Sequence, residues 1–291
     1  MSLQKPTVFT GLATAMITPF ARGEIDYAAF GTMIDRQISA GVDALLVAGT
    51  TGESATLTVR EHYELIRFAA ERIAGRVPLI AGCGSNATEH ALTLARSACD
   101  AGADALLAVT PYYNKTSEKG LVLHYRALSE NVTRPLILYN VPSRTGMSVS
   151  AETYRRLAQE KNIVAVKESS GNLGLMEEIC RECEDSMDVY TGNDDQLLPA
   201  YRLGAKGIFS VYSNLEPAGL REILQLCGNG DFSAAGKKFR TVLPQIQALF
   251  HEVNPIPVKY VAAMRGLCRA EYRLPLCPPS HETAKLLQSL F

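Results

Sequence analysis

Short apolar runs alternate with amphipathic stretches along this chain, from near its first residue to beyond residue 210. Each run has about four to eight residues, which is typical of strands that are buried on both faces. The stretches between the runs repeat apolar residues every three to four positions, as Val59, Tyr63 and Ile66 do, which is typical of helices. The pattern predicts strands over residues 12–17, 44–48, 77–81, 105–109, 135–139, 163–167, 187–191 and 207–211.

A repeated junction indicates how these elements connect. The sequence Ala-Gly-Val-Asp-Ala-Leu-Leu at residues 40–46 recurs with one change at 101–107, and more loosely at 203–209. In each copy a glycine stands where a helix would end in a left-handed turn before a buried strand. Strands that alternate with helices form parallel sheets, and eight strands with reused junctions favour an α/β (β/α)₈ TIM barrel over an open doubly wound sheet. Thr58 followed by Glu61 predicts a capping box at a helix start.

The strand pattern stops after residue 213. Helical patterns follow over residues 232–253, 257–269 and 281–290. We therefore expect a catalytic barrel over residues 1–224 and a C-terminal helical appendage over residues 225–291. The appendage is expected to pack on the barrel or to form an oligomer contact.

Composition narrows the class of protein. The chain has 291 residues, 47% of them hydrophobic and 20% charged, and a net charge of −1, which gives no reason to expect nucleic acid or a membrane surface as a partner. The sequence has neither a signal-peptide pattern nor an apolar run of about 18 residues, so we expect a cytoplasmic protein with reduced cysteines. Cys180 and Cys183 have CxxC spacing, but there is no second ligand pair, and we expect no metal site.

Lys167 closes an apolar run that begins at Ile163. An ammonium at the end of a buried strand loses its water, and desolvation lowers a lysine pKa from about 10.4. A neutral amine is a nucleophile toward carbonyl groups, so Lys167 is a candidate for Schiff-base catalysis. Alternatively, this side chain reaches solvent along its own stem and pairs with Glu168.

The ends of the other predicted strands favour the functional interpretation. In a TIM barrel the catalytic residues lie at the C-terminal ends of the strands. Hydroxyl groups, one arginine and Lys167 all fall at such ends, which predicts that they converge on one mouth. The segments concerned are residues 49–54, 82–86, 110–114, 139–146, 167, 192–194 and 210.

Two glycine-rich segments resemble nucleotide-binding motifs. Gly82-x-Gly84-x-x-Ala87 is followed by Asp104 at about the spacing of a dinucleotide fingerprint. Asp104 has a structural explanation, however, because it occupies the repeated junction where Asp43 is its counterpart. The loop at residues 49–52 lacks the lysine of a P-loop. We therefore expect no nicotinamide or nucleotide cofactor.

Four segments resemble the dihydrodipicolinate synthase (4-hydroxy-tetrahydrodipicolinate synthase) family, within the pyruvate-dependent class I aldolases that include N-acetylneuraminate lyase. The lysine of residues 166–168 and the loop Gly-Thr-Thr-Gly-Glu at 49–53 are typical of the wider group, whereas Ser-Arg-Thr-Gly at 143–146 points to the synthase. Residues 112–114 and the rest of 139–146 also match, and the similarity extends to Asn-Pro-Ile-Pro-Val-Lys at 254–259.

The resemblance implies a role for each residue. Lys167 would form an imine with pyruvate, and Tyr139 would act as acid and base in a relay with Thr50 and with Tyr113 from the neighbouring subunit. Thr50 and Thr51 would hold the pyruvate carboxylate, with the Thr51 N–H as a donor. Arg144 would bind the carboxylate of aspartate-semialdehyde in a bidentate manner. Gly192 and the carbonyl of Phe209 would line the pocket. No cofactor is implied beyond the imine itself, and a homotetramer built as a dimer of dimers is expected.

Simpler explanations compete with these roles. Tyr139 would be an ordinary aromatic strand residue, Arg144 would pair with a surface acid, and the two threonines of the loop would cap the next segment. Tyr112 and Tyr113 would only pack at a subunit contact.

Many family members are inhibited by lysine at the dimer interface. Val59 stands where inhibitable enzymes often have a histidine, and His90 stands where they have a glutamate. The lost carboxylate would have paired with the ammonium of the effector, although the neighbouring Glu89 could replace it. We expect weak or absent feedback, even though five residues match that site: Ser54, Ala55, His62, Asn86 and Tyr112.

Three functions are open at this point. The first is condensation of pyruvate with aspartate-semialdehyde in diaminopimelate and lysine biosynthesis. The second is cleavage of N-acetylneuraminate or of a 2-keto-3-deoxy sugar acid, against which Arg144 argues because a polyhydroxylated substrate calls for hydroxyl partners. The third is a non-catalytic ligand-binding barrel, which would be expected to lack the lysine or the relay tyrosine.

Overall fold

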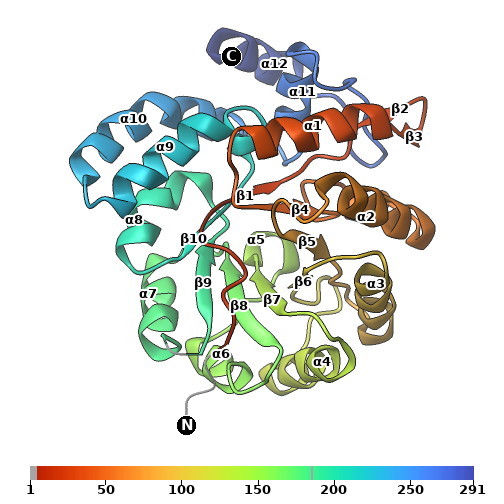
Figure 1. Cartoon of the computed structure of the whole chain (residues 1–291), viewed down its shortest axis with the longest axis vertical. Helices are drawn as coiled ribbons and strands as arrows, with labels where there is room; N and C mark the ends of the chain where they lie inside the picture. Colours follow the sequence, from red (N-terminus) through yellow and green to blue (C-terminus); the bar gives the residue numbers. More distant parts are fainter. Residues whose placement is uncertain (1–4, 185) are drawn as a thin grey trace.

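Eight parallel strands close into a barrel in the computed structural model, which describes residues 5–184 and 186–291 (Figure 1). Each barrel strand pairs with the barrel strand that follows it in the sequence, and the last barrel strand pairs with the first. The predicted TIM barrel is therefore confirmed. Its strands are β1 (Gly11–Ala15), β4 (Ala44–Val47), β5 (Leu79–Gly82), β6 (Ala105–Val109), β7 (Leu136–Asn140), β8 (Ile163–Glu168), β9 (Asp188–Thr191) and β10 (Gly207–Ser210).

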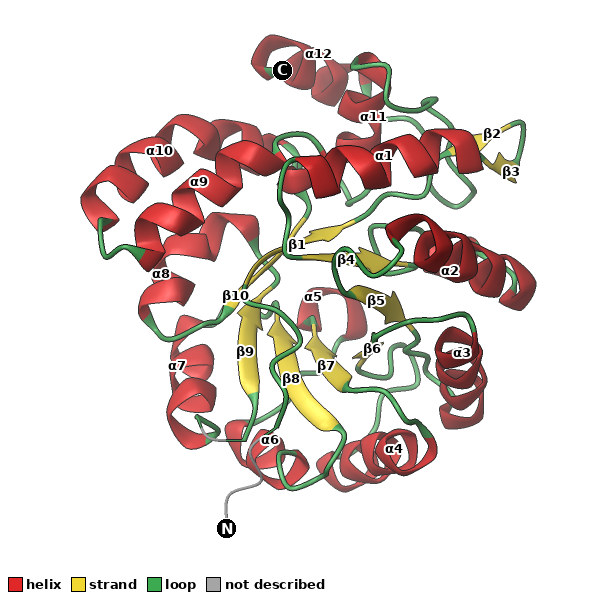
Figure 2. Ribbon diagram, viewed as in Figure 1, coloured by secondary structure: helices red, strands yellow, loops and turns green. Residues whose placement is uncertain are grey.

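Helices cover the outside of the barrel (Figure 2). The capping box predicted at Thr58 and Glu61 is confirmed at the start of α2. The helices that follow successive barrel strands are α1 (Tyr27–Ser39), α2 (Val59–Ile73), α3 (Thr88–Asp100), α4 (Glu118–Asn131), α5 (Pro142–Thr145), α6 (Ala151–Leu157), α7 (Leu173–Glu182), α8 (Leu197–Arg202) and α9 (Pro217–Gly228). Three single turns stand beside them: η1 (Ser54–Thr56), η2 (Asp194–Gln196) and η3 (Tyr212–Asn214).

The C-terminal helices gather on one side of the barrel, where α10 packs against α9 (Figure 1). They are α10 (Phe232–Ala248), α11 (Ile256–Met264) and α12 (His281–Leu290). The predicted boundary between residues 224 and 225 falls inside α9, which joins the barrel to the C-terminal helices. This division of the chain into two regions therefore stays a prediction. Within the described residues, no helix has both the length and the apolar character that crossing a bilayer requires.

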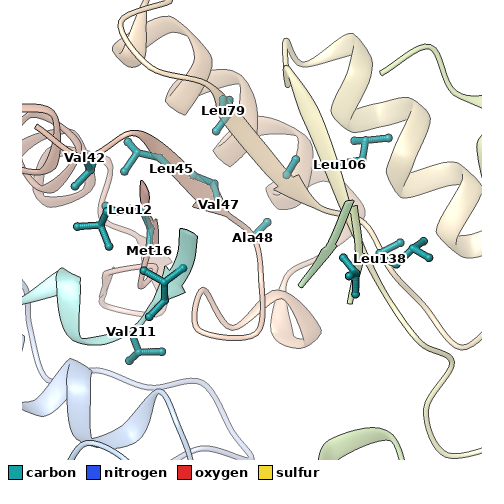
Figure 3. Close-up of a cluster of buried hydrophobic side chains, with 14 of the residues drawn as sticks. Leu12, Met16, Val42, Leu45, Val47, Ala48, Leu79, Leu106, Leu138 and Val211 are labelled. Atoms are coloured by element: carbon teal, nitrogen blue, oxygen red, sulfur yellow. The ribbon is translucent and has the colours of Figure 1, made fainter. Parts of the chain in front are cut away.

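Successive residues of each strand point alternately to the helices and to the barrel interior, so the strands contribute to two hydrophobic clusters. Leu12, Leu45 and Leu106 face the helices and belong to the outer cluster drawn in Figure 3. Ala13 and Leu46 face the interior, where aromatic and aliphatic side chains fill the barrel. Residues of β7 and β8 that point inward near the C-terminal ends therefore reach the mouth.

In two of its three copies, the repeated junction uses its aspartate to bind the backbone of a neighbouring strand. Asp43 accepts a hydrogen bond from Leu12 N at 2.8 Å, and Asp104 accepts one from Leu79 N at 2.9 Å. Gly41 and Gly102 have φ of 79° and 98°, the left-handed conformation that was predicted. The structural explanation of Asp104 is confirmed.

Some boundaries were predicted wrongly. Helix α10 ends at Ala248 instead of residue 253, because the chain turns there to bring Asn254 back to the barrel. Helix α11 ends at Met264 instead of residue 269, because Gly266 adopts φ of 71° and closes the helix with a left-handed turn. The short antiparallel pair β2 (Phe20–Ala21) and β3 (Glu24–Ile25) was missed, since two residues cannot establish a period.

Candidate active site

Lys167 lies near the end of β8 and points into the barrel. Its side chain is buried, and its register partners are Tyr139 on β7 and Tyr190 on β9. The amine Nζ lies 4.3 Å from the ring centroid of Tyr139 and 5.3 Å from that of Phe209. Burial lowers the pKa of Lys167 to about 7, the charge of Asp194 opposes this effect, and the charge of Arg144 adds to it.

The alternative explanation of Lys167 is wrong. The lysine does not reach solvent along its stem, and the neighbouring Glu168 has other partners. Its carboxylate accepts hydrogen bonds from Ser170 N at 2.6 Å and from Asn140 Nδ2 at 3.0 Å. Successive strand residues point to opposite faces, so Glu168 lies on the helix side of β8 while Lys167 lies on the interior side.

An aromatic floor explains the desolvation of the amine. Phe9 stacks on Tyr190 with ring centroids 4.3 Å apart, and Phe209 meets both rings edge-on. The Tyr190 hydroxyl donates to the Phe9 carbonyl at 2.7 Å, so it is satisfied without turning toward the lysine. The barrel interior around Lys167 is therefore lined by aromatic and aliphatic side chains, which cannot solvate an ammonium as water does.

Tyr139 is buried beside the amine. Burial raises the pKa of its phenol, while the charge of Arg144 and the nearby hydroxyls of Thr50 and Ser169 oppose the shift. The phenol is consequently protonated at neutral pH and adjoins two hydroxyl groups, an arrangement that suits proton transfer. The structure thus places Thr50 near Tyr139, and the relay between them stays a prediction.

A tight turn after β4 carries Thr50 and Thr51. Glu53 N donates to the Thr50 carbonyl at 3.1 Å, and the buried Thr51 accepts a hydrogen bond at Oγ1 from Asn254 Nδ2 at 2.9 Å. The capping explanation of these threonines is wrong, since the residue that caps α2 is Thr58 and η1 has no side-chain cap.

Arg144 lies in the short helix α5, with its side chain at the edge of the mouth. Its Nη2 donates to the Asn254 carbonyl at 2.9 Å. Among the described residues no carboxylate forms an ion pair with it, so the proposed pairing with a surface acid is wrong. Most of its donors are therefore free for a ligand.

A cavity of about 530 Å³ opens beside these groups. Thr50, Tyr139 and Arg144 line one part of it, and most of the predicted effector residues line another. Asn86 does not line this cavity, and its carbonyl accepts from Asn114 Nδ2 at 3.0 Å. The residues of the predicted effector site that line the cavity, together with the two positions that differ from inhibitable family members, are Ser54, Ala55, Val59, His62, His90 and Tyr112.

Tyr113 is the one predicted catalytic residue that lies apart from the others. Its side chain is 91% exposed and its φ is 68°, an uncommon conformation for a bulky residue. Tyr112 beside it is also exposed. Two adjacent exposed tyrosines are typical of surfaces that bind another protein.

Gly192, at the end of β9, leaves room for the lysine. A Cβ atom placed there would lie 1.9 Å from Ser169 Oγ and 2.6 Å from Lys167 Cε. Any side chain at this position would displace both groups, so glycine is required by the close approach of the lysine stem.

We expect Gly192→Ala to reduce kcat/KM by about a hundredfold, because the Lys167 amine would be displaced by roughly an ångström. Steady-state kinetics and a thermal melt measure the effect. Gly219→Ala is the matched control, because nothing lies within 4 Å of a Cβ built there in α9. Unchanged kinetics in Gly192→Ala would contradict the packing argument.

Two residues at the site fell within segments that the sequence analysis singled out but were assigned no role there. Asp194 is buried and accepts hydrogen bonds from Ser210 Oγ at 2.5 Å and Val211 N at 2.9 Å. Burial raises its pKa to about 6. Its place after β9 was visible in the sequence, but its pairing with β10 was not. Asn254, which contacts both Thr51 and Arg144, is distant in sequence, and its only signal was the matching segment at residues 254–259.

Acidic, histidine and cysteine side chains do not gather into a metal site in the described part of the chain. Among the described residues, no group of three or more histidine, cysteine, aspartate or glutamate side chains could hold an ion. Cys180 and Cys183 are free thiols at the end of α7, and burial raises both pKa values to about 11. Neither has the lowered pKa of a reactive thiol.

The fold and the site define a (β/α)₈ barrel that presents a desolvated amine, a phenol and a guanidinium at one mouth. A model of the dihydrodipicolinate synthetase family matches residues 8–291, so the chain belongs to this family, as the resemblance predicted. It is 44% identical over 283 residues to the 4-hydroxy-tetrahydrodipicolinate synthase of Caldicellulosiruptor bescii, with 97% of this chain and 96% of the relative covered.

Solved structures give the same result. A crystal structure of dihydrodipicolinate synthase from Aquifex aeolicus superposes with a TM-score of 0.95 at 43% identity and 97% coverage of each chain. A structure of DHDPS from Cyanidioschyzon merolae with lysine bound superposes with a TM-score of 0.94 at 37% identity and 98% coverage of each chain.

Proposed function

We propose that this protein is a lyase that condenses pyruvate with aspartate-4-semialdehyde to 4-hydroxy-tetrahydrodipicolinate, in diaminopimelate and lysine biosynthesis. The observation that carries this proposal is the buried Lys167, whose pKa is lowered to about 7 beside the phenol of Tyr139. The 4-hydroxy-tetrahydrodipicolinate synthases among its relatives support the choice of substrates.

Lys167 performs the covalent chemistry. Its neutral amine attacks the keto carbon of pyruvate, and loss of water leaves an imine. Removal of a proton from the methyl carbon gives an enamine, which forms a carbon–carbon bond with the aldehyde. The amino group of the semialdehyde then displaces Lys167 from the imine carbon, which closes the ring and returns the free amine. The reaction needs no further cofactor.

Tyr139 moves the protons. Its protonated phenol donates to the departing oxygen when the imine forms, and its phenolate accepts a proton on return. Thr50 lies beside it and relays the proton toward Tyr113 of a neighbouring subunit. The exposure of Tyr113 on this chain supports that arrangement, so the smallest active unit is a dimer, and we propose a tetramer of two dimers.

The carboxylates of the two substrates are bound at different places. Thr51 holds that of pyruvate, next to the lysine. Arg144 binds that of the semialdehyde at the edge of the mouth, where a planar guanidinium offers two parallel donors. Gly192 and the carbonyl of Phe209 complete the pocket around the imine.

Trapping tests the proposal. The protein is incubated with pyruvate and cyanoborohydride, the adduct is located by peptide mass, and untreated enzyme is assayed with aspartate-semialdehyde and with a sugar aldehyde. We expect the adduct on Lys167 and turnover with the semialdehyde alone. Turnover with the sugar aldehyde alone would indicate a different pyruvate aldolase, and an unmodified Lys167 would exclude both enzymes.

The rate of imine formation should depend on pH around neutrality. Protonated Lys167 cannot attack a carbonyl, and its pKa is lowered from 10.5 to about 7 by burial. The initial rate of trapping by cyanoborohydride should therefore rise with pH and reach half of its maximum near pH 7. A rate that still climbs steeply above pH 9 would indicate an unperturbed lysine.

Feedback by lysine should be weak. His90 and Val59 line the cavity where the resemblance implies a glutamate and a histidine, so the effector's ammonium lacks one carboxylate. We expect lysine at submillimolar concentration to leave the initial rate unchanged. The double variant Val59→His with His90→Glu should gain inhibition, and strong inhibition of the unmodified protein would refute the expectation.

A further inference from the structure

A fully buried ion pair joins the C-terminal helices to the loop that carries Thr50 and Thr51. Lys259 Nζ in α11 lies 2.5 Å from Glu53 Oε1, and neither side chain has any exposed surface. The ammonium also lies 4.1 Å from the ring centroid of Phe20. Glu53 is the last residue of the Gly-Thr-Thr-Gly-Glu turn, three positions after Thr50.

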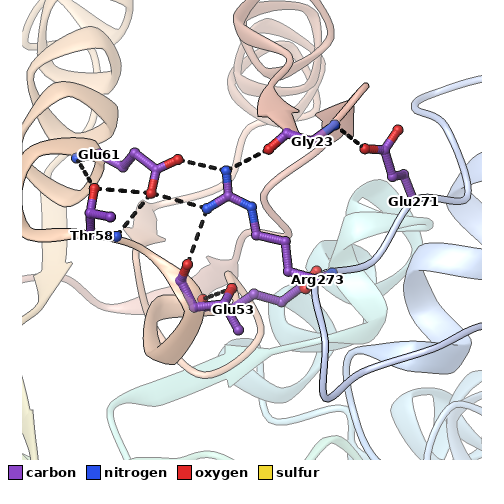
Figure 4. A network of polar contacts seen from close by, with 7 residues as sticks. Gly23, Glu53, Thr58, Glu61, Glu271 and Arg273 are labelled. Atoms are coloured by element: carbon purple, nitrogen blue, oxygen red, sulfur yellow. Dashed lines mark hydrogen bonds and ion pairs between the residues drawn. The ribbon is translucent and has the colours of Figure 1, made fainter.

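The other oxygen of the Glu53 carboxylate faces a second C-terminal segment (Figure 4). Arg273 N approaches Glu53 Oε2 at 3.4 Å, while the Arg273 guanidinium binds Glu61 at 2.6 Å and the Thr56 carbonyl at 3.1 Å. Two separate parts of the C-terminal region therefore contact this turn and the start of α2.

Stability alone does not explain a pair in this position. Two buried charges lose much of their hydration energy, and apolar replacements of the same volume are often equally stable or more stable. The effect of this pair is therefore expected in the geometry of the turn that carries Glu53. When both side chains of an ion pair are fully buried, neither can turn to solvent, so the pair fixes the distance between the two backbone segments that carry them.

The backbone of Glu53 shows what is fixed. Its φ is 56° and its ψ is 35°, the left-handed region that is uncommon for residues other than glycine. In this conformation its N–H donates to the Thr50 carbonyl at 3.1 Å and closes the turn. The side chain that holds Glu53 in place therefore also sets the path of Thr50 and Thr51.

Asn254, just before α11, provides a second connection to the same turn. Its Nδ2 donates to Thr51 Oγ1 at 2.9 Å, and its carbonyl accepts from Arg144 at 2.9 Å. One short segment, residues 254–259, thus contacts the proposed pyruvate loop twice and the proposed semialdehyde-binding arginine once.

We propose that Lys259 and Glu53 are positioning residues, whose buried pair holds the Thr50–Thr51 turn in the conformation that binds the pyruvate carboxylate. This inference rests on the proposed function of Lys167. It assigns to the C-terminal helices a part in the active site, although they supply no group that touches the reacting atoms.

A charge-neutral double variant tests the inference. Glu53→Gln and Lys259→Met alone each leave a buried charge without its partner and should lower the melting temperature strongly. The double variant removes both charges and should recover most of the melting temperature. If the pair positions the turn, KM for pyruvate in the double variant stays raised by about tenfold or more, while kcat at saturating pyruvate changes much less.

Arg265→Met is the matched control. Arg265 caps α11 and pairs with Glu216 at 2.7 Å, so this variant removes an ion pair from the same helix without touching the turn. It should leave KM for pyruvate unchanged. If the double variant does not fold, Glu53→Asp replaces it, because it keeps both charges and shortens the connection by one methylene group; it should raise KM for pyruvate in the same way.

The outcomes separate the two proposals. A wild-type KM for pyruvate in the double variant, or in Glu53→Asp, overturns the positioning role even if the unmodified protein forms its adduct on Lys167. An unmodified protein that forms no adduct with pyruvate overturns the proposed function instead. An equal rise of KM in Arg265→Met would assign the effect to general loosening of α11 and would also overturn the positioning role.

Discussion

Lys167→Ala should yield a folded protein that forms no adduct with pyruvate and whose turnover is lower by roughly a millionfold, as expected when a covalent nucleophile is removed. The reason is geometric as well as chemical. Among the described residues, no other amine lies near the rings of Tyr139 and Phe209 in the barrel interior. No neighbouring side chain can therefore replace the amine of Lys167. Mass spectrometry after cyanoborohydride treatment and steady-state kinetics measure the two losses.

Two variants control this result. Lys161→Ala removes an exposed lysine just before β8 and should leave the adduct and the turnover unchanged. Lys167→Met keeps the volume of the side chain but removes a desolvated amine, so its melting temperature should be no lower than that of the unmodified protein. An adduct that persists in Lys167→Ala on another lysine would show that the imine forms elsewhere.

The barrel was predictable because its strands are buried on both faces. Such strands appear as continuous apolar runs, and the repeated junctions mark where β4, β6 and β10 begin. Lys167 was predictable for the same reason, since a charged residue at the end of such a run must either escape to solvent or be desolvated. The sequence left both outcomes open. The aromatic floor of Phe9, Tyr190 and Phe209 favours desolvation, and it combines a residue just before β1 with residues of β9 and β10, about 180 positions further along the chain.

Contacts between distant segments could not be predicted from the chain. Asn254 lies 203 residues from Thr51, and Lys259 lies 206 residues from Glu53, so no local period connects them. The predicted boundaries failed nearby for a related reason: α10 ends early because the chain must return to the mouth, which is a tertiary requirement. The family resemblance covered this segment, but it gave no physical account of the contacts.

Tyr139→Phe should lower kcat by about 10² to 10⁴-fold, the usual range for loss of a general acid or base. Phenylalanine keeps the ring 4.3 Å from the lysine amine and removes only the hydroxyl, so the desolvation of Lys167 should persist. Trapping with pyruvate and cyanoborohydride should therefore still label Lys167, although more slowly. This pattern distinguishes a proton-transfer role from a packing role, in which the fold would change and kcat would not.

Tyr125→Phe is the matched control for that substitution. Tyr125 is also fully buried, and its hydroxyl donates to the Ala108 carbonyl at 3.2 Å on the helix side of the barrel. Its loss should cost about 1 kcal/mol of unfolding free energy and leave kcat unchanged. If Tyr139→Phe behaved in the same way, with a small loss of stability and wild-type turnover, Tyr139 would be a packing residue and the proton relay would have to begin at another group.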